Sequence, residues 1–75
     1  MSAAKTKRTL TTATADEVLP RFGLAVLVDD EARTWAVTRS TEGPGLDRLR
    51  AGQRVQLTLD HHPEFSVVRA YDPQN

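Results

Sequence analysis

Trp35 and the two arginines near it, Arg33 and Arg39, are the residues whose types and spacing best suit ligand binding. A nucleic-acid base can stack on an indole ring, and arginine contacts phosphate groups. Because alternate residues of a strand share a face, an outward-pointing Trp35 would stand between the two arginines. The same spacing also fits an inward-pointing Trp35, which would share the core with Val37. Both orientations stay open from the sequence.

His61 and His62 raise a second possibility, a metal site, because neutral imidazole binds zinc and copper. Adjacent strand residues point to opposite faces, however. Together with Asp60 and Glu64 they would form an open site, in which no hydrogen bonds hold the ligands in place. We therefore predict a polar hairpin turn here, and we expect no metal and no other cofactor.

The sequence carries no motif for catalysis. No Gly-x-Ser-x-Gly motif and no Gly-rich phosphate loop is present, and we expect neither Ser40 nor Ser66 to lie beside a histidine. The carboxylates of Asp29, Asp30 and Glu31 lie in one turn, where we expect water to solvate them. The prediction is a protein that is not an enzyme and has no small-molecule substrate.

The distribution of charge suggests another contact. The chain has ten basic and ten acidic residues, but Lys5, Lys7 and Arg8 all lie in the first eight positions. Residues 9–75 then hold seven basic residues against ten acidic ones. Since nucleic-acid affinity depends on cations that neutralise phosphates, the N-terminal segment would have to supply much of the positive charge. The alternative is a solvated basic segment that has no partner.

Length and composition fit a single domain. The 75 residues include no cysteine, and 39% of them are hydrophobic. No segment approaches the roughly 18 apolar residues of a membrane-spanning helix. The basic N-terminus is not followed by the apolar stretch of a secretory signal. We expect a cytoplasmic protein that does not contact membranes.

Alternating apolar and polar residues predict four strands. The first two form a hairpin around a polar turn, and the loop 41–52 places Leu46 and Leu49 where both can cover the end of a barrel. In the last strand the phase is ambiguous, because apolar residues occupy both sets of alternating positions. The predicted strands are residues 22–29, 34–40, 53–60 and 65–71.

The N-terminal segment is predicted to lie outside the barrel. We expect a flexible tail in residues 1–13 and the barrel domain in residues 14–75. Thr14 and Glu17 have the spacing of a capping box, which favours a single helical turn that ends at Pro20. An alternative is that residues 6–14 add a strand, in an SH3-like arrangement.

Three segments of the chain match motifs of a known barrel. Residues 23–30 correspond to an opening Gly-x-Val strand, residues 33–38 correspond to Lys-Gly-Phe-Gly-Phe-Ile, and Leu49-Arg50-Ala51-Gly52-Gln53-Arg54-Val55 corresponds to Leu-x-x-Gly-Gln-x-Val. From Phe22 to Pro73 the chain therefore resembles the cold-shock domain. That family is a five-stranded OB-fold barrel that binds single-stranded RNA or DNA.

The departures from this resemblance fall where the family stacks bases. Leu27 and Val28 stand in place of aromatic residues, and of the stacking positions only Trp35 is aromatic. The family's Val-Phe-Val-His strand has no counterpart before Gly43. Because each stacked base contributes about 1–3 kcal/mol, a single aromatic residue implies weak binding.

The sequence thus predicts an all-β fold, a small OB-like (cold-shock-like) antiparallel barrel. We expect it to bind single-stranded RNA or DNA weakly through one β-face and the basic tail. The alternative is a protein-interaction or oligomerisation module that uses an exposed strand edge, because the shortened loop 39–52 lacks one strand of the family. The predicted nucleic-acid contacts are Arg33, Trp35, Arg39, Lys5, Lys7 and Arg8.

Overall fold

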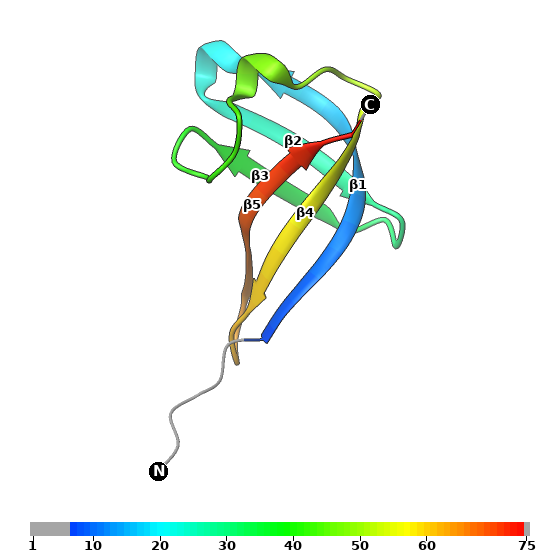
Figure 1. Ribbon diagram of the computed structural model, residues 1–75, viewed down its shortest axis with the longest axis vertical. Helices are drawn as coiled ribbons and strands as arrows, with labels where there is room; N and C mark the ends of the chain where they lie inside the picture. Colours follow the sequence, from blue (N-terminus) through cyan, green and yellow to red (C-terminus); the bar gives the residue numbers. More distant parts are fainter. Residues whose placement is uncertain (1–6, 75) are drawn as a thin grey trace.

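The computed structural model describes residues 7–74, which form five β-strands in one sheet (Figure 1). Two short 3-10 turns, η1 (Pro20–Phe22) and η2 (Leu46–Arg48), lie in the connections before β2 and β4. No helix in this part of the chain is long and apolar enough to cross a membrane. The strands are β1 (Lys7–Leu19), β2 (Leu24–Asp29), β3 (Thr34–Thr38), β4 (Arg54–His61) and β5 (Ser66–Pro73).

The strand order is β3-β2-β1-β4-β5, and all neighbouring strands are antiparallel. The long β1 is central: its first part pairs with β4, from Lys7 opposite His61 onward, and its second part pairs with β2, ending with Leu19 opposite Leu24. The sheet curls into a half-barrel (Figure 1). This confirms the predicted all-β class and is consistent with a small OB-like barrel.

β1 corrects two predictions about the N-terminal region. The expected flexible tail is wrong for residues 7–13, and the expected helical turn at 14–17 is also strand. The strand alternative is confirmed for residues 7–14. Threonine is β-branched and suits a strand, and residues 7–13 pair with β4, which satisfies backbone groups of this segment that water would otherwise solvate. The folded unit therefore begins before residue 14, whereas residues 1–6 lie outside the described residues.

Two irregularities in pairing decide which side chains reach the core. Thr58 of β4 pairs with Ala70 of β5, and Leu59 pairs with Val68, so Arg69 is an extra residue in β5. This bulge puts both Val68 and Tyr71 on the inner face, which settles the ambiguous phase of the last strand. A similar shift in β1 lies between Ala15 and Glu17.

The core lies inside the curled sheet. Leu46 and Leu49 are buried over it, as their spacing predicted. The buried hydrophobic residues are Ala13, Ala15, Ala25, Leu27, Val37, Leu46, Leu49, Val55, Leu57, Leu59 and Tyr71.

Tyr71 links β5 to the loop that follows β3. Its backbone N–H donates to the Glu42 carbonyl at 3.0 Å, and its hydroxyl accepts a hydrogen bond from the Gly45 N–H at 2.8 Å. Gly43 packs so closely that an added Cβ would overlap the tyrosine ring. Since Glu42 also forms a parallel bridge with Ala70, this loop spans the gap between the two edge strands.

Candidate nucleic-acid interface

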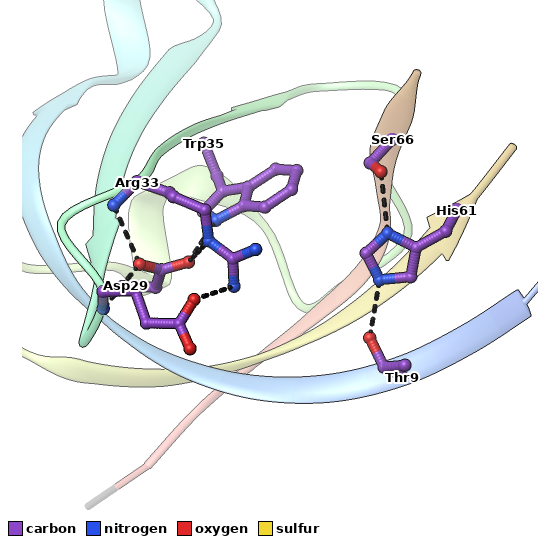
Figure 2. Close-up of polar contacts among 7 residues, drawn as sticks. Thr9, Asp29, Arg33, Trp35, His61 and Ser66 are labelled. Carbon is purple, nitrogen blue, oxygen red and sulfur yellow. Dashed lines mark hydrogen bonds and ion pairs between the residues drawn. The ribbon is translucent and has the colours of Figure 1, made fainter. Parts of the chain in front are cut away.

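Trp35 is half-buried and packs against the core, and its polar edge is occupied (Figure 2). The residue opposite it in β2 is the buried Leu27, so the indole lies on the inner face of the sheet. Its Nε1–H donates a hydrogen bond to Asp29 Oδ2 at 2.9 Å. The sequence left two orientations of Trp35 open, and its side chain points inward.

Asp29 is the centre of the β2–β3 turn. Its side chain is fully shielded from solvent, which corrects the expectation that water solvates it. Oδ1 accepts the backbone N–H groups of Glu31 and Arg33, both at 2.9 Å. Burial alone would raise the pKa of this carboxyl group, but hydrogen bonds from Trp35, Arg33 and Glu31 lower the pKa to about 2. Asp29 is therefore a negatively charged structural anchor.

Arg33 belongs to the same cluster. Its Nε lies 2.8 Å from Asp29 Oδ2, one terminal nitrogen lies 3.2 Å from Glu31 Oε1, and its guanidinium lies over the Trp35 ring at 5.7 Å from the centroid. Two carboxylates thus face one guanidinium. This arrangement stabilises the turn, and it leaves little net positive charge for a phosphate.

Arg39 does not join this cluster. It follows β3 and reaches η1, where its guanidinium donates to the Pro20 carbonyl at 2.9 Å and lies against Gly23. The predicted stripe of Arg33, Trp35 and Arg39 is therefore wrong. The opposite face of β2 and β3 has no aromatic or charged side chain, since it carries Leu24, Val26, Val28, Thr34, Ala36 and Thr38.

Other cations near the turn are also engaged. Arg54 forms two hydrogen bonds with the carboxylate of Asp30, at 3.0 and 3.1 Å, and a third with Thr14. The pKa of Asp30 is lowered mainly by the hydrogen bond from Arg54. Asp30 too is held by a protein partner. The hollow beside Arg54, between Arg50 and Gln74, is open and contains no buried ligand-binding group.

The remaining predicted contacts lie at the far end of β1. Lys7 begins β1 opposite His61, whereas Lys5 lies outside the described residues. Arg8 Nε lies 3.0 Å from Asp60 Oδ1, and Arg69 reaches Oδ2 of the same carboxylate at 3.6 Å. The hydrogen bond from Arg8 lowers the pKa of Asp60, although partial burial opposes it. Asp60 thus holds two arginines together.

The ends of β1, β4 and β5 that carry these arginines project from the half-barrel as a three-stranded arm (Figure 1). Three of the four exposed large hydrophobic residues in the described chain lie in it: Leu10 (64% exposed), Phe65 (58%) and Val67 (41%). We call one side of the arm the outer arm face, on the side opposite the core. It consists of Arg8, Leu10, Asp60, His62, Phe65, Val67 and Arg69.

An aromatic pair lies at the tip of the outer arm face. The rings of His62 and Phe65 stack with centroids 4.6 Å apart and an interplanar angle of 27°. The sequence shows the alternation of Phe65, Val67 and Arg69. Their neighbours Arg8 and Leu10 could not be found without the register of β1, which was expected to be a tail.

His61 points to the opposite, inner side of the arm, as adjacent strand residues should. Its two ring nitrogens contact the hydroxyl groups of Thr9 and Ser66 (Figure 2). The expectation that no serine lies beside a histidine is therefore wrong. Among residues 7–74, no group of three or more His, Cys, Asp or Glu side chains is placed to hold a metal ion.

We compared the chain with known protein families, curated proteins and solved structures. Neither a scan against protein-family models nor searches of curated proteins and of solved structures finds a match to this chain.

Proposed function

We propose that this protein is a small, non-enzymatic OB-like barrel, similar to a cold-shock domain, that binds single-stranded RNA or DNA weakly through the outer arm face. The observation that carries the proposal is the exposed Phe65 ring, stacked on the half-buried His62, on the same face as Arg8 and Arg69. An aromatic surface beside cations is the combination that single-stranded nucleic acids need. OB-fold barrels also use the loop between their fourth and fifth strands for such ligands.

Each part of the face has a separate role in this proposal. Phe65 offers an exposed ring on which one base stacks, and Arg8 and Arg69, each about half exposed, contact phosphates. Asp60 keeps the two guanidiniums on one side of the arm but cancels one of their charges. Because a single base stacks and the net charge is small, the affinity is weak and depends on salt.

The second candidate is a protein-interaction module, and the apolar part of the same face favours it. Leu10, Phe65 and Val67 are exposed together, and β5 is an edge strand of the sheet. Exposed apolar residues beside an open edge are typical of protein contacts. A concentration-dependent mass in light scattering, without any nucleic-acid binding, would favour this candidate.

Fluorescence anisotropy of a labelled oligo-dT or oligo-U tests the proposal. We expect binding at low salt, with a slope of log affinity against log salt of about −1.4 for two phosphate contacts. Arg69→Gln should bring the slope to about −0.7. Phe65→Ala should weaken binding about tenfold or more.

The chain offers a matched control. Phe22 is the other phenylalanine and is 77% exposed at η1, away from the arm. Phe22→Ala should leave the affinity unchanged. Equal losses in the two phenylalanine variants, or binding that ignores salt, would rule out the outer arm face as the contact surface.

A further inference from the structure

The inner side of the arm carries a hydrogen-bonded chain of three side chains. Ser66 Oγ lies 2.7 Å from His61 Nδ1, and Thr9 Oγ1 lies 2.8 Å from His61 Nε2. Figure 2 shows the imidazole between the two hydroxyl groups. The chain links three strands, because Thr9 lies in β1, His61 ends β4 and Ser66 begins β5.

This geometry is that of an activated nucleophile. A hydroxyl becomes nucleophilic when a base lies within hydrogen-bond reach and a third group orients that base. When Nε2–H donates to Thr9, Nδ1 carries the lone pair and accepts the Ser66 hydroxyl proton. We propose that Ser66 is a covalent modification site, at which an activated acyl donor such as an ester or thioester transfers its acyl group to Oγ.

The atoms and charges of this acyl transfer balance without any further reactant. A bond forms between Ser66 Oγ and the acyl carbon, and the bond from that carbon to the leaving oxygen or sulfur breaks. The serine proton passes to His61 Nδ1 and from there to the leaving group or to water. The products are acyl-Ser66 and the released alcohol or thiol, and His61 returns to its neutral form.

The position of the chain supports access by a donor. Ser66 and Thr9 are exposed, and His61 is half-buried, so the base is held while the nucleophile faces solvent. The hairpin closes just beyond this point, where the His62 N–H donates to the Phe65 carbonyl at 2.7 Å. Thr9 acts as a positioning residue, because it touches only the base.

The test uses p-nitrophenyl acetate with the full chain, followed by mass spectrometry of the intact protein and of its peptides. Ser40 is an internal control: it is an exposed serine with a threonine hydroxyl, Thr38 Oγ1, at 3.0 Å and no imidazole contact in the structure. General-base assistance should make Ser66 react roughly 100-fold faster than Ser40. No adduct on Ser66, or equal rates at the two serines, would overturn the proposal.

Variants of the residues around Ser66 distinguish a loss of base activation from a loss of folding. His61→Gln should reduce the rate at Ser66 to that at Ser40, whereas Phe22→Leu, at the exposed end of η1, should leave it unchanged. Thr9→Val should lower the ratio of Ser66 to Ser40 labelling, and Thr9→Ser should restore it. An unchanged Ser66 rate in His61→Gln would contradict the proposal, and the ratio in the wild-type chain decides it even where a variant fails to fold.

Discussion

The indole N–H of Trp35 donates a hydrogen bond to the solvent-shielded carboxylate of Asp29, with 2.9 Å between Nε1 and Oδ2. Trp35→Phe keeps most of the ring but leaves that oxygen without one of its donors. We expect the midpoint of thermal unfolding, measured by circular dichroism, to fall by roughly 4–8 °C. Phe22→Leu, at an exposed site, should unfold at the wild-type temperature; a Trp35→Phe variant that did the same would show that the bond is dispensable.

The stability of the fold should depend on pH through the carboxylate of Asp29. Although burial opposes it, the hydrogen bonds on Asp29 lower its pKa from 3.8 to about 2. Because the folded pKa is the lower one, ionised Asp29 stabilises the fold above the ordinary pKa, and this contribution is lost as pH falls toward the folded value. The pKa values of Asp30 and Asp60 are lowered too.

We therefore expect the free energy of unfolding in urea to be constant from neutral pH to about pH 5 and to fall between about pH 4 and pH 2. Asp29→Asn should be less stable at neutral pH and should show a shallower acid dependence. An equally steep dependence in this variant would mean that other carboxylates cause it.

Ala32 in the β2–β3 turn has a left-handed backbone, with φ of 65°. An L-residue is strained there and glycine is not, so Ala32→Gly should raise the free energy of unfolding by about 0.5–1 kcal/mol. The matched control is Ala36→Gly in the middle of β3, which should lower it by about 0.5–1 kcal/mol. The same sign of change at both sites would contradict the turn geometry.

Truncation tests the central place of β1. A chain that starts at Lys7 keeps every residue of the strand and should unfold cooperatively. A chain that starts at Thr14 leaves β4 without the partners of residues 55–61. We expect this second chain to lose its cooperative urea transition. A folded second chain would restore the interpretation of residues 7–13 as a tail.

The sequence was most informative where apolar residues alternate strictly. Val55, Leu57 and Leu59 are fully or almost fully buried in β4, and Leu46 and Leu49 are buried as their spacing indicated. β1 was predicted only as an alternative, over residues 6–14, because threonine and alanine give a weak apolar pattern and its pairing with β4 joins residues far apart in the sequence. The phase of β5 was ambiguous because its bulge has no signature in the sequence.

The site was harder to predict than the fold. Asp29 reads as a solvated turn carboxylate, and only the hairpin geometry brings it to the Trp35 indole. Arg8 and Phe65 are far apart in the sequence, and they share a face only because β1, β4 and β5 pair in one register. Residue types were visible in the sequence, whereas their neighbours depended on strand pairing.

We propose that single-stranded nucleic acid contacts the outer arm face. Titration of the isotope-labelled chain with short oligo-dT at low salt, followed through its amide NMR spectrum, tests this claim most directly. We expect the largest shifts at Arg8, Asp60, Phe65 and Arg69, with little change along Leu24–Asp29. No shifts at high micromolar oligonucleotide, or shifts confined to the β2–β3 hairpin around Trp35, would contradict it.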